Sequence, residues 1–179
     1  QGMTIEGCFV YRVSRWGIAV GYTYAHATFQ GGALAEASFR KYGHEHLVIR
    51  DNYVKSAGGD GITAMYALRP LVEHNMADSV ACEINDRIYS EAGNKMGKVA
   101  AGIWPWKCKD ALFRFNEVAD TRLNQDGMAY DADSGDGTLY EYNYSRQNEG
   151  GCVMFCLQEA IHNTFRHNLS YDDLGGTIS

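Results

Sequence analysis

The sequence predicts an all-β solenoid in which short parallel strands stack coil upon coil. Three observations support this fold class. A pattern of one apolar residue, two variable residues and an asparagine recurs along the chain. Glycine is abundant at 20 residues while proline is scarce at 2, which favours tight turns between short strands. No helical periodicity runs through the recurring segments. The length of 179 residues fits one domain, 1–179.

The repeats align on their asparagine. Five copies cover residues 47–62, 70–84, 111–128, 138–153 and 163–178, and their aligned residues are Asn52, Asn75, Asn116, Asn143 and Asn168. A sixth copy, residues 3–18, has Cys8 in the asparagine position. Some steps between copies are longer than the others, which indicates a coil with loops inserted into it.

Two columns of the alignment predict how each coil faces its surroundings. The residue three positions before the asparagine is apolar and is expected to fill the interior: Ile5, Ile49, Val72, Phe113, Tyr140 and Phe165. The next residue alternates in charge: Glu6, Arg50, Glu73, Arg114, Glu141 and Arg166. On parallel strands about 4.8 Å apart, that order predicts an exposed ladder of opposite charges.

The asparagines themselves are expected to form a stacked ladder that closes a turn. Asn143 and Asn168 also begin sequences that match the N-glycosylation acceptor pattern. Asn52, Asn75 and Asn116 occupy the same repeat position without that pattern, so one structural role explains all five better than glycosylation does.

The composition excludes several classes of partner. A net charge of −6 and a pI near 5.5 argue against nucleic acid and anionic membranes, which bind basic surfaces. No apolar run is long enough to span a membrane, and a signal peptide is either absent or lies upstream. The five cysteines lack zinc-type spacing. They are expected to be buried free thiols, with a Cys82–Cys108 disulfide left open.

The segments GIWPW, FNEVADT, DGMAYDADSGDG and YEYNYSRQNEGG resemble the right-handed parallel β-helix proteins found among secreted glycoside hydrolases and polysaccharide lyases. The resemblance extends from about Met3 to Ile178. It implies a right-handed parallel β-helix of about six coils with inserted loops, either part of a longer solenoid or packed end-on against another chain. It also implies a carbohydrate ligand and a secreted, periplasmic or cell-surface location. It does not select one reaction, because this scaffold serves hydrolases, lyases, epimerases and adhesins.

Three stretches between the copies are expected to be loops: residues 19–46, 85–110 and 129–137. Each follows the second strand of a coil, so all three should leave the solenoid on the same side and line a groove. The first loop contains GGALAEASFRKYG, which predicts a short helix after its glycines.

Acidic residues near this groove are the catalytic candidates. Asp60 and Glu83 stand eight residues beyond their asparagines, and Asp126 follows after a two-residue bulge. We therefore expect one column of carboxylates on three successive coils. Carboxylates about 5 Å apart do not all ionise, so one should have a raised pKa, as the acid of a glycosidase requires. The alternative for each residue is a turn, because Asp60 and Asp126 precede glycine.

The segment QDGMAYDADSGDG adds Asp131 and Asp133, which alternate on an extended segment and should point to the same face. Asp136 is expected to be a turn residue. Four acids within this segment also fit a calcium site, although the spacing differs from that of an EF-hand. No cofactor is otherwise required, and the segment could instead be a solvated loop.

Aromatic side chains provide the flat apolar faces on which sugars stack. Trp104 and Trp106, in the loop at 85–110, are the best candidates, and alternation across Pro105 turns both indoles to one side. Tyr130 and Tyr89 are placed behind them, and Glu83 is counted with the substrate-binding residues. Packing that anchors the loop is the alternative for each tryptophan.

The sequence thus predicts a glycoside hydrolase that cleaves a polysaccharide or oligosaccharide. Asp126 is the first candidate for acid or nucleophile, with Asp133 or Asp131 as partner and Asp60 next. One alternative is a polysaccharide lyase, in which lysines of the loop would bind a uronate: Lys98, Lys107 and Lys109. The other is a non-catalytic adhesin or carbohydrate-binding solenoid whose carboxylates serve as turn residues or calcium ligands.

Overall fold

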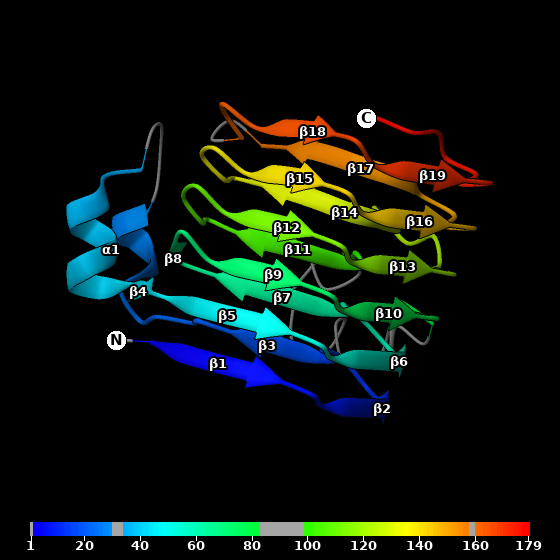
Figure 1. The fold of residues 1–179 in the computed structure, drawn as a ribbon, viewed down its shortest axis with the longest axis horizontal. Coiled ribbons are helices and arrows are strands. Elements are labelled where there is room, and N and C mark those ends of the chain that lie inside the picture. Colours follow the sequence, from blue (N-terminus) through cyan, green and yellow to red (C-terminus); the bar gives the residue numbers. More distant parts are fainter. Residues whose placement is uncertain (1, 30–33, 83–98, 158–159) are drawn as a thin grey trace.

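The computed structural model describes residues 2–29, 34–82, 99–157 and 160–179. Its strands stack into three parallel sheets that form the faces of a right-handed parallel β-helix (Figure 1). The amino-terminal and carboxyl-terminal ends of the chain lie at opposite ends of the stack. The predicted fold class is therefore confirmed.

The first two sheets each contain six strands of the described chain. The first consists of β1 (Met3–Glu6), β5 (Leu47–Arg50), β9 (Leu71–Glu73), β12 (Leu112–Arg114), β15 (Leu139–Glu141) and β18 (Thr164–Arg166). The second consists of β2 (Phe9–Val13), β6 (Tyr53–Ala57), β10 (Met76–Asp78), β13 (Glu117–Ala119), β16 (Tyr144–Arg146) and β19 (Leu169–Tyr171). These are the two strands that flank each aligned asparagine, so the repeat alignment located both sheets.

The third sheet contains five strands of the described chain: β3 (Ile18–Val20), β7 (Ile62–Met65), β11 (Ile103–Trp106), β14 (Met128–Asp133) and β17 (Gly151–Cys156). All three predicted loops are therefore wrong in part, because β3 extends into 19–46, β11 falls within 85–110 and β14 overlaps 129–137. Ile103 of β11 is the neighbour of Ile62 in the third sheet, a position that the repeat alignment gave to Ile84.

The interior contains the predicted apolar column. Ile49, Val72, Phe113 and Tyr140 are fully buried in one hydrophobic core, and Ile5 and Phe165 pack against it from the end coils. The rings of Phe113 and Tyr140 lie 5.0 Å apart. Burial of this continuous apolar column from coil to coil is the main force that holds the stack together.

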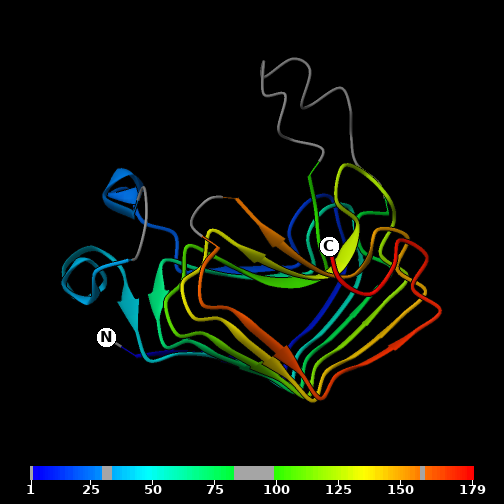
Figure 2. The ribbon, with the colours of Figure 1, turned by 90° about the horizontal axis from the view of Figure 1, so that it is seen from above.

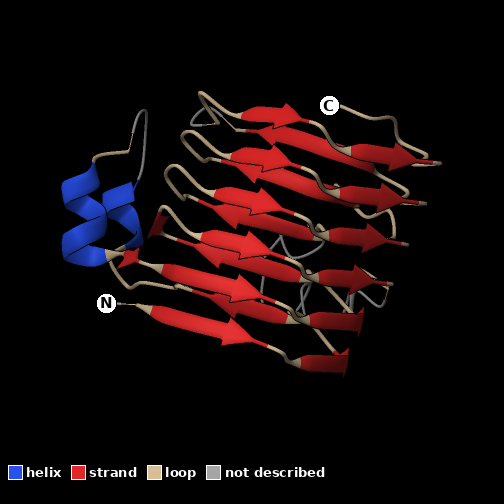
Figure 3. Ribbon diagram, in the orientation of Figure 1, coloured by secondary structure: helices blue, strands red, loops and turns tan. Residues whose placement is uncertain are grey.

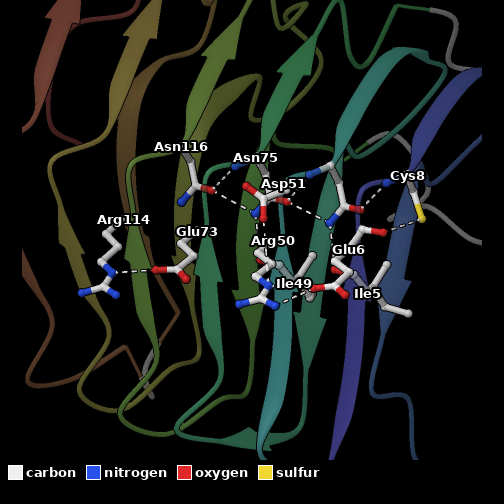
Figure 4. Close-up of polar contacts among 11 residues, drawn as sticks. Ile5, Glu6, Cys8, Ile49, Arg50, Asp51, Glu73, Asn75, Arg114 and Asn116 are labelled. Carbon is white, nitrogen blue, oxygen red and sulfur yellow. Dashed lines mark hydrogen bonds and ion pairs between the residues drawn. The ribbon is translucent and has the colours of Figure 1, made fainter.

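The asparagine ladder is confirmed (Figure 4). The side-chain amide of Asn52 donates to Oδ1 of Asn75 at 2.9 Å, and the same contact continues from Asn75 to Asn116 and from Asn116 to Asn143 at 3.0 Å. Each of these amides also donates to a backbone carbonyl of the preceding coil. Asn143 is only 2% exposed, so its side chain is committed to the turn.

The charge ladder is also present on the outside of the first sheet, where Figure 4 shows two of its pairs. Arg50 pairs with Glu6 at 2.7 Å, Arg114 with Glu73 at 2.8 Å, and Arg166 with Glu141 at 2.8 Å. Such exposed pairs contribute little to stability individually. They avoid like-charge contacts between neighbouring strands.

The helical part of the chain lies beside the solenoid and outside its coils (Figures 2 and 3). It comprises η1 (His26–Phe29) and α1 (Glu36–Tyr42), the short helix predicted from the sequence. A two-stranded sheet of β4 (His44–Glu45) and β8 (Ala67–Leu68) connects it to the coils. Phe29, Phe39 and Tyr66 form a second hydrophobic cluster, on which Trp106 packs.

The remaining sequence predictions concern sulfur and membranes. All five cysteines are free, so the Cys82–Cys108 disulfide is not formed. Cys108 and Cys152 are buried as expected, whereas Cys8 and Cys82 are exposed. No helix in the described part of the chain is long and apolar enough to cross a membrane.

Candidate active site

The candidate site lies on the outer face of the third sheet. Strand pairing aligns Thr63 of β7 with Trp104 of β11, and it aligns Met65, Trp106 and Asp133 on β7, β11 and β14. The alternate residues of these strands point into the core, which forces the two tryptophans and the two aspartates of β14 to the outside. Along β11 and the second half of β14, apolar inward side chains thus alternate with aromatic or acidic outward ones.

A pocket of about 270 Å³ opens on this face. Four of the predicted site residues line it: Asp60, Trp104, Trp106 and Asp133. The other lining residues were not singled out from the sequence: Arg15, Trp16, Tyr22, Thr63, Met65, Tyr66 and Val99. Aromatic walls with a few converging polar groups are typical of a small-molecule site.

Both tryptophans are held by their indole nitrogens. Nε1 of Trp104 donates to Oδ1 of Asp60 at 2.9 Å, and Nε1 of Trp106 donates to the hydroxyl of Tyr66 at 2.8 Å. The two rings meet edge to face, with centroids 6.2 Å apart. Their N–H groups are occupied, so they offer their rings to the pocket. The prediction that an overhanging loop carries them is wrong, because they belong to β11.

Asp126 lies in the turn that leads into β14. Oδ1 of Asn124 organises this turn, since it accepts the backbone N–H groups of Ala100, Gln125 and Asp126 at 3.0, 2.8 and 3.0 Å. Burial, together with the charge of Asp60, raises the pKa of Asp126 to about 6. A carboxylic acid that keeps its proton near neutral pH can serve as a general acid. Sequence reasoning missed the role of Asn124.

Asp131 and Asp133 share the outer face of β14, as predicted, but their surroundings differ. Asp131 is 2% exposed, and its Oδ1 has no hydrogen-bond partner within the described chain. Burial, followed by the charges of Asp133, Asp126 and Asp60, raises the pKa of Asp131 well above its usual range. Asp133 lines the pocket, and its Oδ1 accepts the hydroxyl of Ser134 at 3.1 Å. Asp133 is therefore the carboxylate of β14 that reaches the pocket.

The predicted column of Asp60, Glu83 and Asp126 is wrong. The pairing of Ile62 with Ile103 places Ala101 opposite Asp60, and the pairing of Ile103 with Tyr130 places Met128 next in line. Asp126 is thus two residues out of register, even with the two-residue bulge that the alignment assumed. Glu83 and Tyr89 lie outside the described residues.

Tyr130 is not a substrate-binding residue in this geometry. Its side chain is fully buried in the core, and its hydroxyl donates toward the backbone carbonyls of Asn116 and Tyr144 at 3.0 and 2.7 Å. The prediction failed because it placed Tyr130 in a loop, whereas Tyr130 belongs to β14 and its side chain packs in the hydrophobic core.

The basic residues of this region have other roles. Lys109 pairs with Asp136 at 2.6 Å, and Asp136 also contacts Nδ1 of His162 at 2.9 Å. Asp136 lies between β14 and β15 and is only 3% exposed. It is therefore a buried partner of two basic side chains. Lys107 is buried, and Lys98 lies outside the described residues. Neither described lysine lines the pocket.

Metal binding gains no support from the side chains. Within residues 2–29, 34–82, 99–157 and 160–179, no group of three or more His, Cys, Asp or Glu residues is arranged to hold a metal ion. The calcium alternative stays an untested prediction.

Comparisons with known proteins match the chain to a part of two larger proteins. No protein-family model matches it. Over 98% of its length it is 48% identical to a curated protein from Bifidobacterium longum subsp. longum. Crystal structures of a protein from Eubacterium ramulus, one native and one a selenomethionine derivative, match 98% of the chain with 64% identity and a TM-score of 0.94. Both relatives are lacto-N-biosidases. The E. ramulus enzyme belongs to GH136.

The similarity covers only part of each relative. The chain spans 12% of the curated protein and 28% of the crystallised chain. Agreement at this identity and TM-score extends over all six coils, so the three-sheet solenoid described above is the fold of that part of the E. ramulus enzyme. In the present chain, the third sheet carries three of the predicted site residues that line the pocket: Trp104, Trp106 and Asp133.

Proposed function

We propose that this chain carries the catalytic centre of a glycoside hydrolase that acts as a lacto-N-biosidase on an oligosaccharide. The observation that carries the proposal is a carboxyl group of raised pKa, Asp126, in the turn that leads into β14, the strand whose Asp133 lines the pocket beside two indoles that meet edge to face. The lacto-N-biosidase relatives support the substrate class.

In the proposed reaction Asp126 is the general acid. It gives its proton to the glycosidic oxygen as the bond to the anomeric carbon breaks. Asp133 provides the electron pair, either by attacking the anomeric carbon itself or by taking a proton from a water that attacks. If the first sugar released keeps the configuration of its anomeric carbon, Asp133 attacks directly. If that configuration is inverted, a water attacks.

The remaining pocket residues hold the sugar. Trp104 and Trp106 offer the apolar faces on which a pyranose ring stacks, and their fixed N–H groups keep the rings in place. Asp131 is buried on the same strand, and its burial raises the pKa of its carboxyl group, which disfavours a negative charge beside a neutral oligosaccharide. The net charge of −6 also fits a neutral substrate better than a uronate polymer.

The polysaccharide lyase alternative is disfavoured for a specific reason. A lyase needs a cation beside its base to bind the uronate carboxylate. Lys109 is already paired with Asp136, and Lys107 is buried. Arg15, which does line the pocket, pairs with Asp60.

The test compares Asp126→Asn and Asp133→Asn in the full-length enzyme on two substrates. One is an oligosaccharide that ends in lacto-N-biose, and the other is p-nitrophenyl lacto-N-bioside, whose leaving group needs no proton. We expect Asp133→Asn to lose about 10³-fold or more on both substrates. Asp126→Asn should lose about as much on the oligosaccharide and much less on the nitrophenyl glycoside.

The matched control is Asp136→Asn, a buried carboxylate on the same solenoid that does not line the pocket. It should leave both rates within about threefold of wild type. Wild-type turnover of the oligosaccharide by Asp126→Asn or Asp133→Asn would refute the assignment. A secreted or cell-surface location belongs to the same proposal, and antibody detection in fractionated cells tests it.

A further inference from the structure

Asp60 was a catalytic candidate from the sequence, but its surroundings are those of a structural carboxylate. It follows β6, in the turn before β7, and its side chain is 1% exposed. Oδ1 accepts the indole N–H of Trp104 at 2.9 Å and the backbone N–H of Ala101 at 3.0 Å. Oδ2 lies 3.3 Å from Nη2 of Arg15. A nucleophile or proton donor needs access to the substrate, and these oxygens face protein donors.

Asp60 and its donors come from three successive coils. Arg15 belongs to the turn between β2 and β3, Asp60 to the next coil, and Ala101 and Trp104 to the third. Nη2 of Arg15 also donates to the carbonyl of Val99 at 3.2 Å. Asp60 thus joins the first coil to residues 99–104, which form one wall of the pocket.

The backbone leaves room for this contact. A Cβ on Gly59 would lie 2.4 Å from Nη1 of Arg15, so glycine at this position leaves the space that the guanidinium occupies beside Asp60. The backbone N–H of Gly59 donates to the carbonyl of Arg15 at 2.9 Å, which fixes the turn.

We propose that Asp60 is a positioning residue that fixes the indole of Trp104 and the adjoining backbone at Ala101, and so shapes the sugar-binding wall of the pocket. The expected changes in KM and kcat rest on the proposed glycosidase function, whereas the contact between Asp60 and Trp104 does not. Without Asp60, the N–H of Trp104 loses its acceptor and the ring is free to rotate out of the pocket. The carboxylates that carry out the reaction remain in place.

The experiment uses the full-length enzyme with Asp60→Ala, which removes both acceptor oxygens, and Asp60→Asn, which keeps one oxygen for Trp104 and Ala101 but loses the charge opposite Arg15. We expect Asp60→Ala to raise KM for p-nitrophenyl lacto-N-bioside about tenfold with a smaller change in kcat. Asp60→Asn should restore most of the KM. Asp136→Asn controls for the loss of a buried carboxylate.

A second measurement reports on Trp104 without catalysis. Proteins labelled with 5-fluorotryptophan give one fluorine NMR resonance for each indole, and Trp104→Phe identifies that of Trp104. We expect this resonance to shift or broaden in Asp60→Ala and to stay close to its wild-type position in Asp60→Asn. If the wild-type enzyme proves inactive, the proposed function fails while this measurement still decides the role of Asp60.

Two results would overturn the proposal. One is an unchanged Trp104 resonance and an unchanged KM in a folded Asp60→Ala protein. The other is a kcat in Asp60→Asn that falls as far as in Asp133→Asn with no change in KM, because that loss would make Asp60 a catalytic residue. If Asp60→Ala does not fold, Asp60→Ala with Arg15→Met removes the stranded charge, and the same criteria apply.

Discussion

Replacing Asn116 by alanine removes the central rung of the asparagine ladder. Its Oδ1 accepts the backbone N–H and the side-chain amide of Asn75, both at 3.0 Å. Its Nδ2 donates to the carbonyl of Val72 at 2.9 Å and to Oδ1 of Asn143 at 3.0 Å. Asn116 is 2% exposed, so water cannot replace these contacts.

The cost follows from the groups that are left unpaired. The variant strands two donors on Asn75 and removes a donor from Val72, and a buried polar group without a partner costs about 1–3 kcal/mol. The costs of the separate unpaired groups do not add fully, because neighbouring asparagines of the ladder relax together. We therefore expect a loss of about 3 kcal/mol in the free energy of unfolding. That is large against the total stability of a domain.

The assay is urea unfolding followed by circular dichroism, with Arg114→Ala as the control. Arg114 lies in the same coil, two residues earlier, and its guanidinium pairs with Glu73 and lies over the exposed ring of Phe115, so its loss should cost less than about 1 kcal/mol. If Asn116→Ala costs no more than Arg114→Ala, the asparagine ladder does not stabilise the solenoid as described.

Two further predictions concern the pocket. Asp126 must hold its proton to act as the acid, and its pKa is raised to about 6, so kcat/KM on the oligosaccharide should fall about tenfold per pH unit above that value; a flat profile from pH 5 to 8 would contradict this role. Tyr66→Phe removes the acceptor for Nε1 of Trp106 and should raise KM about threefold to tenfold with little change in kcat. A fall in kcat at constant KM would show that Trp106 does not serve mainly to bind the sugar.

The first two sheets could be predicted because their contacts repeat. The asparagine, the apolar residue before it and the alternating charge recur in each coil, so a contact between Asn75 and Asn116 is implied by the alignment alone. When coils of the same repeat stack, each residue contacts the equivalent residue of the next coil.

The third sheet was missed because its outer face carries the site. Trp104 and Trp106 occupy outward positions where polar residues would have marked a strand, and Asp131 and Asp133 lie in a segment that was interpreted as a loop. The signal that could have located it is the pair glycine–isoleucine, which begins the third strand at Ile18, Ile62 and Ile103. Glycine is needed there because a Cβ on Gly61 would lie 2.5 Å from the carbonyl oxygen of Gly102.

The pocket could be predicted only in part. Asp133 and the two tryptophans were correctly grouped because alternation along a strand fixes their direction. The contact between Asp60 and Trp104 joins residues 44 positions apart and depends on the register of an irregular coil. No repeat describes that register, so the alignment offered a column of carboxylates in place of the hydrogen bond.

The central claim is that Asp126 and Asp133 are the two reacting carboxylates. Chemical rescue by azide tests it most directly, because the small anion fills the space of a missing carboxylate and attacks the anomeric carbon. In the full-length enzyme with p-nitrophenyl lacto-N-bioside, Asp133→Ala and Asp126→Ala should each regain turnover and release a glycosyl azide, while Asp60→Ala should release only the free sugar. A glycosyl azide from Asp60→Ala, with none from the other two variants, would contradict the account.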